Sequence, residues 1–418
     1  MAQLKDDCFA FDGQLMPLDD ALTILTERLG PVTGTEDVPL RRGLDRILSD
    51  DVIAGRDVPP RDNSAVDGYA VFFDDLKADG ETRLAVTGRL AAGHPLDRAA
   101  RRGEALRIFT GAPMPEGPDT IFMEEDCQAE GDIVVLPPGL VRGANRRKAG
   151  EDIPLGTVVA RAGQRLRPQE IGVAASVGRS RLRVYRRLKA AVFSTGDEVR
   201  DPDQDAPDGC IFDANRYTVM GLLEGLGCEI TDLGILPDDL DAIQGALESA
   251  AAGHDLLITS GGVSAGEEDY VKAAVEAHGQ IHFWRLAIKP GRPIALGQVD
   301  ETAFVGLPGN PVAAMVTFMV IARPVALLLA GCTDVAATRF RVRAGFDYKK
   351  KQGRREWARV RIEINGKGEP VAMKYSAGGA GILTSMVEAD GLVELPEDMS
   401  TLAEGATVDF LPFNEVMR

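Results

Sequence analysis

The segment of this chain with the clearest chemical character is a short apolar run that ends in paired glycines and small hydroxyl residues. Residues 256–258 (LLI) are typical of a buried parallel strand, and residues 259–262 (TSGG) follow directly. Glycines let backbone N–H groups approach an anionic ligand, and the helix expected from residue 270 adds partial positive charge. The acids of residues 267–269 (EED) would repel a bare phosphate, but they suit an anion held through a divalent cation. A purely structural alternative, a tight strand–helix turn followed by an acidic first helical turn, explains the same residues equally well.

Similar loops follow other predicted strands of the same region. Residues 194–198 (STGDE) and 306–311 (GLPGNP) each follow a short apolar run, and residues 289–293 (KPGRP) place two cations on a stiff turn. Asn310 is expected to cap the helix that starts at Pro311, which would leave free N–H groups facing an anion. Parallel strands end at one edge of a sheet, so these loops predict a single ligand site there.

Three further motifs precede that region, and each has a plain structural alternative to a functional role. PPRDNSAVDGYA (residues 59–70) could hold a ligand or form a turn with capping aspartates. RIFTGAPMPEG (residues 107–117) could present Thr110 in a fixed position or serve only as a connector. GANRRKAGEDI (residues 143–153) is either an anion-binding patch or a solvated charge run.

Bulk properties restrict the classes of function. The formal net charge of -17 argues against general binding to nucleic acid or to anionic membranes. The five cysteines are far apart and form no metal-binding spacing, so we expect free thiols in a reducing cytoplasm. The N-terminus has no signal-peptide pattern, and the most apolar segment, residues 312–329, is expected to be a buried helix.

The order of predicted elements indicates several domains. Leucines at residues 18, 22, 25 and 29 predict an amphipathic helix, and residues 38–53 could hold a second one. Short strands between residues 69 and 136 predict a small β-rich domain. Strands alternate with helices over residues 190–330, which predicts an α/β domain with a doubly wound, mostly parallel sheet. Alternating patterns after residue 338 predict a small β-barrel or sandwich, in which no catalytic constellation is visible.

Taken together and in this order, the motifs resemble those of the bacterial molybdopterin molybdenumtransferases, whose module also forms the C-terminal domain of gephyrin. The resemblance rests on DNSAVDGYA, RIFTGAPMPEG, RRKAGEDI, STGDE, TSGGVSAGEEDY, LAIKPGRP and GLPGNP, and it covers nearly the whole chain. SGGVS and LPGNP are shared with the molybdopterin adenylyltransferases, whereas DNSAVDGYA and RIFTGAPMP favour the molybdenum-inserting branch. Two departures are Ala265, where valine is common, and Ala214, where serine is usual.

The resemblance implies four domains and a homodimer. The expected limits are residues 1–50 with 145–185 for an elongated linker domain, 51–144 for the β-rich insert, 186–331 for the doubly wound molybdopterin-binding domain, and 332–418 for a C-terminal β-barrel. The active cleft is expected to lie between the doubly wound domain of one chain and the β-rich domain of the other.

The resemblance also implies the reaction and its residues. Adenylylated molybdopterin and molybdate are the expected substrates, AMP is released, and Mg²⁺ is the expected cofactor. The implied catalytic set is Asp62, Asp67, Thr110, Asp152, Glu198, Asp238 and Asp269, and the last three are the expected metal ligands. The implied substrate- and anion-binding set is Thr195, Gly196, Ser260, Gly261, Gly262, Ser264, Gly266, Lys289, Arg292, Pro308, Gly309, Asn310 and Pro311.

Two alternatives remain at the level of sequence. One is adenylyl transfer to molybdopterin, and the other is a non-catalytic scaffold that retains the fold. Expected protein partners are a molybdopterin adenylyltransferase and molybdoenzyme apoproteins, with no nucleic acid and no membrane.

Overall fold

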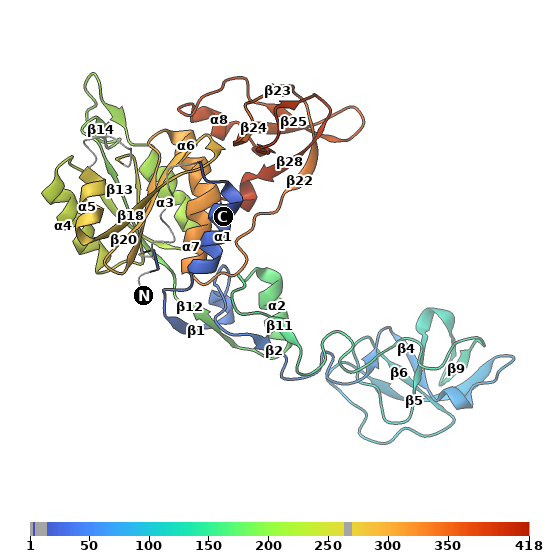
Figure 1. Ribbon diagram of the computed structural model, residues 1–418. Coiled ribbons are helices and arrows are strands. Elements are labelled where there is room, and N and C mark those ends of the chain that lie inside the picture. Colours follow the sequence, from blue (N-terminus) through green and yellow to red (C-terminus); the bar gives the residue numbers. More distant parts are fainter. Residues whose placement is uncertain (1–2, 5–14, 263–269, 418) are drawn as a thin grey trace.

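The computed structural model describes residues 3–4, 15–262 and 270–417. Ser264, Gly266 and Asp269 lie outside the described residues. The chain forms an elongated molecule, with the β-rich domain at one end and the doubly wound and C-terminal domains at the other (Figure 1). A narrow neck joins the two ends.

A six-stranded sheet forms the centre of the doubly wound domain. Its strands lie in the order β16 (Glu229–Leu236), β13 (Lys189–Thr195), β17 (Leu256–Ser260), β21 (Thr302–Leu307), β20 (Pro293–Val299) and β18 (Gly279–Arg285). The first four strands are parallel, and β20 runs antiparallel to both of its neighbours. The predicted mostly parallel sheet is therefore confirmed.

Helices cover both faces of this sheet because successive strand residues are buried on opposite sides. On one face, Ala191 and Phe193 of β13 pack with α4 (Leu240–Ala251) and α5 (Tyr270–His278). On the other face, Ala190 and Val192 pack with α3 (Asn215–Gly225) and the long C-terminal helix. The N-terminal helix α1 (Leu18–Arg28) joins this second layer.

The long helix comprises α6 (Pro311–Thr317), one π-helical turn (η5, Phe318–Ala322) and α7 (Arg323–Leu329). Its 19 residues are long and apolar enough to cross a membrane, but 94% of its apolar window is buried inside the protein. The expectation of a buried core helix is confirmed.

Two short antiparallel pairs and one helix form the neck (Figure 1). They are β1 (Thr35–Pro39) with β12 (Arg181–Tyr185), β2 (Val52–Ile53) with β11 (Val158–Ala160), and α2 (Pro168–Ser176). The helix considered for residues 38–53 is wrong. Residues 35–39 pair with a strand far away in sequence, and Gly43 lies where a Cβ would come within 2.6 Å of Ile171.

The chain passes through the neck twice on its way to and from the β-rich domain. Val58 and Ile153 mark the crossing, because each donates its backbone N–H to the carbonyl of the other, at 2.8 and 3.0 Å. Val52 and Ala54 belong to the core of the neck. The limits of 51 and 144 remain a proposal, and this packing favours moving them toward residues 58 and 153.

The β-rich domain is a six-stranded sheet with two small apolar clusters. Its strands lie in the order β7 (Thr120–Met123), β4 (Gly68–Val71), β6 (Glu104–Ile108), β5 (Thr82–Leu90), β9 (Ile133–Leu136) and β8 (Gln128–Glu130). A short pair, β3 (Asn63–Ser64) with β10 (Arg146–Arg147), connects it to the neck.

The C-terminal domain is a barrel, because β24 pairs with both β25 and β26 and so closes the sheet. Its strands are β22 (Phe340–Ala344), β24 (Arg355–Ile364), β25 (Pro370–Lys374), β26 (Gly391–Leu395) and β28 (Thr407–Pro412), with β23 (Tyr348–Lys349), β27 (Thr401–Leu402) and α8 (Thr384–Val387) beside them. The start of β24 also pairs in parallel with β19 (Ile288–Lys289) from the doubly wound domain. The barrel is thus joined to that domain by backbone hydrogen bonding.

Candidate functional site

Several carboxylate side chains lie close together at the carboxyl edge of the sheet, where β13 and β16 end. The backbone N–H of Asp197 donates to Asp238 Oδ2 at 3.2 Å. Burial raises the pKa of Asp238, and the negative charges of Asp197 and Glu198 raise it further. Two of the three expected metal ligands, Glu198 and Asp238, are therefore neighbours, while Asp269 lies outside the described residues.

Close packing explains the glycines of the neighbouring loops. Gly262 has φ +63° and lies where a Cβ would come within 2.4 Å of Thr195 Oγ1. Gly196 has φ +135°, and a Cβ there would come within 2.8 Å of Glu198 Oε2. A side chain at either position would be strained; at Gly262 it would collide with Thr195 of the neighbouring loop, and at Gly196 with Glu198 of its own loop.

A cleft of about 610 Å³ lies between this edge and the C-terminal barrel. The doubly wound domain supplies one wall, including eight predicted site residues: Glu198, Gly261, Gly262, Lys289, Arg292, Pro308, Gly309 and Asn310. The barrel supplies the other wall, including Tyr348, Glu356, Trp357, Arg359 and Lys374. The sequence showed no catalytic constellation in the C-terminal domain, and the structure adds the barrel as a second wall of the cleft.

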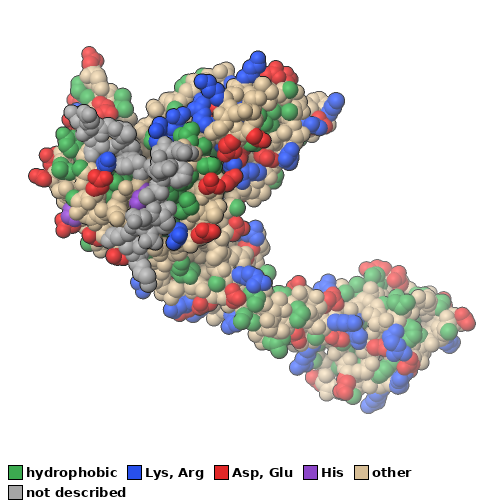
Figure 2. All heavy atoms as spheres, in the orientation of Figure 1, with side chains coloured by type: hydrophobic (Ala, Val, Ile, Leu, Met, Phe, Trp, Pro, Cys, Tyr) green, Lys and Arg blue, Asp and Glu red, His purple; other side chains and the backbone are tan. Residues whose placement is uncertain are grey.

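The cleft is rich in hydrogen-bond donors. Figure 2 shows Lys and Arg side chains gathered near the junction of the two domains. Within the described part of the chain, the buried Trp357 Nε1 and Arg359 Nε lack hydrogen-bond partners. Arg292 forms no ion pair with any described residue, whereas Lys289 Nζ lies 3.2 Å from Glu356 Oε2. The side chains of Arg292, Arg359 and Lys374 line the cleft, and cationic side chains in a cleft suit an oxyanion ligand.

Glu356 is the acidic counterpart in the barrel wall. Its side chain is only 3% exposed, and it accepts a hydrogen bond of 3.0 Å from the Tyr348 hydroxyl. Burial and the charge of Glu356 raise the pKa of Tyr348 to about 12, so this phenol stays protonated.

The start of the long helix differs from the sequence expectation. Asn310 precedes Pro311, but its side chain caps no N–H group among the described residues. The Val312 N–H donates to the carbonyl of Ala380 in the barrel, at 2.9 Å. The barrel loop thereby occupies one N–H group that was expected to face an anion.

The side chain of Asn215 joins the two glycine loops, and sequence reasoning missed it. Its Nδ2 donates to Ser260 Oγ at 2.9 Å and to the Gly309 carbonyl at 2.7 Å. Ser260 Oγ in turn donates to the Pro308 carbonyl at 3.0 Å. An asparagine at the start of a predicted helix, after an acidic loop, was the available signal.

The other predicted catalytic residues lie in the β-rich domain and beside the neck. Asp67 Oδ1 accepts the Thr110 backbone N–H at 2.7 Å and its hydroxyl at 2.8 Å. The backbone bond, followed by the hydroxyl bond, lowers the pKa of Asp67. Asp62 Oδ1 accepts the Ala149 N–H at 2.8 Å, and Asp152 donates its backbone N–H to Val58.

These residues are remote from the cleft in a single chain. The β-rich domain occupies the far end of the molecule from the doubly wound sheet (Figure 1). The structure therefore gathers the predicted site residues into two groups, one at each end. Among the described residues, no three His, Cys, Asp or Glu side chains are arranged to hold a metal ion.

Comparisons with known proteins cover almost the whole chain. Residues 16–178 match the MoeA N-terminal region (domains I and II), residues 191–327 a probable molybdopterin binding domain, and residues 341–413 the MoeA C-terminal region (domain IV). A molybdopterin molybdenumtransferase of Haemophilus influenzae is 38% identical over 405 residues, which span 96% of this chain and 100% of the relative. The chain belongs to the MoeA family of molybdopterin molybdenumtransferases.

Further relatives agree with this assignment. The Nostoc molybdopterin molybdenumtransferase is 32% identical over 397 residues, covering 92% of this chain and 90% of the relative. The crystal structure of the molybdopterin biosynthesis MoeA protein of Pyrococcus horikoshii superposes with a TM-score of 0.81 at 27% identity, covering 96% of this chain and 100% of that one. This MoeA family member is thus a molybdopterin-binding transferase of molybdenum cofactor biosynthesis.

Proposed function

We propose that this MoeA family member inserts molybdenum from molybdate into adenylylated molybdopterin, and that hydrolysis of the adenylate releases AMP. The cleft of about 610 Å³ is the observation that supports this most. It combines Glu198, the glycine loops and the cations Lys289 and Arg292 on one wall with the cations Arg359 and Lys374 on the barrel wall. Such a site can bind an oxyanion and a phosphate ester at the same time.

The anion part of the cleft is proposed to lie between the turn at Lys289–Arg292 and the barrel wall. The cationic side chains of Lys289, Arg292 and Arg359 line this part of the cleft. Because the net charge of the chain is -17, these local donors must attract the anions against the overall charge. The glycine loops, which lack side chains, would leave room for the phosphate of the pterin substrate.

Mg²⁺ is proposed to bind at Glu198, Asp238 and Asp269. Besides burial, the charges of Asp197 and Glu198 contribute to the raised pKa of Asp238. A bound cation would relieve this repulsion, so the arrangement fits a cation site. When bound, Mg²⁺ would neutralise charge on the phosphate oxygens. The carboxylates themselves orient the cation and keep the edge of the cleft negative when it is absent.

The group in the β-rich domain is proposed to act from a second copy of the chain. Asp67 is ionised at neutral pH, and it holds the Thr110 hydroxyl by accepting its proton in a hydrogen bond. This leaves the hydroxyl oxygen free to orient a water. The water oxygen would bond to the adenylate phosphorus and lose its proton to solvent, while the bond from that phosphorus to the phosphate oxygen of molybdopterin breaks and AMP leaves. Asp62 and Asp152 would lie beside this pair in the completed site. A homodimer is proposed because one chain alone keeps the two groups apart.

The remaining features of the proposal are its location and its partners. Cytoplasmic location is proposed from the free thiols at residues 127, 210, 228 and 332. A molybdopterin adenylyltransferase that supplies the substrate, and apoenzymes that receive the cofactor, remain proposed partners.

The test is to mix purified protein with adenylylated molybdopterin, Mg²⁺ and molybdate and to follow AMP. We expect AMP release that depends on molybdate. Production of adenylylated molybdopterin from ATP would instead identify an adenylyltransferase. Binding of molybdopterin with no turnover under either condition would identify a scaffold.

A further inference from the structure

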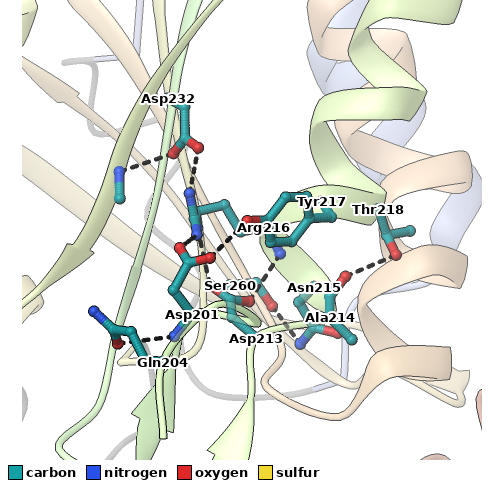
Figure 3. Close-up of polar contacts among 11 residues, drawn as sticks. Asp201, Gln204, Asp213, Ala214, Asn215, Arg216, Tyr217, Thr218, Asp232 and Ser260 are labelled. Atoms are coloured by element: carbon teal, nitrogen blue, oxygen red, sulfur yellow. Dashed lines mark hydrogen bonds and ion pairs between the residues drawn. The ribbon is translucent and has the colours of Figure 1, made fainter.

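One side chain connects the two glycine-rich loops of the cleft. Asn215 lies in the first turn of α3, and its amide group points toward Ser260 at the end of β17 (Figure 3). Both of its hydrogen bonds leave from Nδ2, to Ser260 Oγ at 2.9 Å and to Gly309 O at 2.7 Å. The carbonyl oxygen of Gly309 can only accept, which fixes the orientation of the amide.

Ser260 completes the connection. Its hydroxyl proton is donated to the Pro308 carbonyl at 3.0 Å, while its oxygen accepts from Asn215. The proton of Ser260 is therefore already used within the protein, so this hydroxyl cannot donate to a ligand without breaking the connection. We call the set of Asn215, Ser260, Pro308 and Gly309 the loop clasp.

The loops have few other ways to hold their spacing. Gly261, Gly262 and Gly309 carry no side chains, and the loops approach closely, with Gly261 Cα 3.7 Å from the position of a Cβ on Gly309. A backbone hydrogen bond of 3.1 Å from Gly261 N to Leu307 O joins the strand ends. The loop clasp adds side-chain bonds beyond that point, where the loops enter the cleft.

The residue next to Asn215 anchors the helix turn that carries it. The Arg216 side chain is 2% exposed and forms ion pairs with Asp201, Asp213 and Asp232 (Figure 3). Burial works against its charged form, but the hydrogen bonds to Asp232 and Asp213 outweigh burial and raise its pKa. Asp213 also accepts the Arg216 backbone N–H at 3.1 Å, in the place where Ala214 has no side chain to cap the helix.

Such a buried network serves geometry more than stability. Buried ion pairs often contribute little net stability, because desolvation offsets their attraction, but they require one arrangement of the groups involved. Here the arrangement fixes the first turn of α3 and, with it, the position of the Asn215 amide.

We propose that Asn215 is a positioning residue that sets the separation of the two glycine loops for binding of the pterin phosphate. Arg216 and its three carboxylates hold Asn215 in place. Ser260 acts through the loop clasp, and its hydroxyl does not contact the substrate. The inference rests on the proposed function, because it assigns a role at the same cleft.

The test replaces Asn215 by a residue of the same shape. Asn215→Asp keeps the size of the side chain but removes both donated hydrogen bonds at neutral pH. Tyr217→Phe is the matched control, because it removes a hydrogen bond of 2.7 Å to Asp201 on the same helix turn without touching either loop. Each variant is compared with the wild type by calorimetry with adenylylated molybdopterin and by amide hydrogen exchange without ligand.

We expect Asn215→Asp to weaken binding about tenfold, because two hydrogen bonds are lost. Exchange at Gly261, Gly262 and Gly309 should become faster while the melting temperature stays close to that of the wild type. In AMP release, KM should rise more than kcat falls. Tyr217→Phe should match the wild type in all of these measurements.

A double-mutant cycle tests the part played by Ser260. Asn215→Ala and Ser260→Ala should each weaken binding. The loss of binding free energy in the double variant should be smaller than the sum of the two single losses, because both residues act through one connection. Additive effects would overturn the connection through Ser260. Unchanged loop exchange in Asn215→Asp would overturn the positioning role itself. If the wild type bound no adenylylated molybdopterin, the proposed function would fail, while loop exchange would still decide the role of Asn215.

Discussion

Replacing Arg292 or Lys289 by alanine tests whether the cleft binds its anion through the turn of residues 289–292, which precedes β20. The two cations differ in their surroundings. Arg292 forms no ion pair with any described residue, so its charge is fully available to a ligand. Lys289 shares its charge with the buried Glu356, at 3.2 Å. Their replacement by alanine should therefore have different consequences.

The magnitudes follow from these contacts. A charge-assisted hydrogen bond to an oxyanion contributes roughly 1.5–3 kcal/mol, so Arg292→Ala should weaken anion binding by about tenfold to a hundredfold. It should leave the stability of the protein unchanged. Lys289→Ala should weaken binding at least as much, because it also exposes the anion to the charge of Glu356.

Lys289→Ala should also reduce stability slightly. Lys289 is 55% exposed, so its ion pair contributes at most about 1 kcal/mol. Glu356 keeps its bonds with Tyr348 and its ion pair with Arg354 at 3.6 Å, which limits the loss. The expected decrease in melting temperature is about 2 °C.

Calorimetry with molybdate, calorimetry with adenylylated molybdopterin and thermal melts measure these effects. Combining Lys289→Ala with Glu356→Gln should restore the melting temperature and only that part of the molybdate affinity that is lost to the charge of Glu356. Arg146→Ala is the competing variant, since Arg146 lies beside Asp62 at 3.5 Å, away from the cleft. If Arg146→Ala abolished molybdate binding while Arg292→Ala had no effect, the anion site would lie near the β-rich domain and the reasoning would be refuted.

Three further predictions concern acidic residues. Hydrogen bonds from Arg98 lower the pKa of Glu104 from 4.5 to about 2, so its stabilising effect is present above pH 4.5 and is lost as the pH falls toward 2. Glu104→Gln should cost about 2 kcal/mol at pH 7, a difference in thermal unfolding that disappears in acid. Burial and the charges of Asp197 and Glu198 raise the pKa of Asp238, so folding disfavours its charged form; Asp238→Asn should raise the melting temperature without Mg²⁺ and reduce the stabilisation that added Mg²⁺ gives. Equal responses to Mg²⁺ in both proteins would argue against this ligand. Asp67→Asn and Glu198→Gln chains should each release little AMP alone but regain activity when mixed, because a mixed dimer has one intact cleft; no recovery after demonstrated subunit exchange would contradict the shared site.

The sequence predicted those elements whose signals are local. Helix α4 is one of the helices predicted to alternate with strands over residues 190–330, and its signals are local: Asp239 caps it, and Ile243, Leu247 and Ala250 form one buried face. The loops after β13, β17 and β21 were assigned to one edge correctly, since parallel strands leave no other arrangement. The helix expected for residues 38–53 failed because residues 38–39 pair with 181–182 and residues 52–53 pair with β11, and local propensity contains no information about such distant partners.

The barrel wall of the cleft could not be predicted for a related reason. Trp357 and Arg359 have no ligand-binding spacing of their own, and they reach the cleft only because β24 pairs with β19. Arg355 strengthens this docking through its ion pair with Asp19 of α1 at 2.8 Å, while its ion pair with Glu394 at 3.1 Å lies within the barrel. Contacts among segments so distant in sequence depend on the assembled fold. Asn215 escaped notice because a lone asparagine at a helix start usually serves as a cap.

The paired crossing at Val58 and Ile153 makes the β-rich domain a cassette within the chain. Its two ends are hydrogen-bonded to each other, so a short linker could rejoin the neck after the cassette is cut out. Likewise, the cassette of one family member could be grafted into another at these two positions. Chimeras of this kind would exchange Asp67 and Thr110 but leave the cleft of the recipient unchanged. Their activity would show whether the two groups of site residues function when they come from different family members.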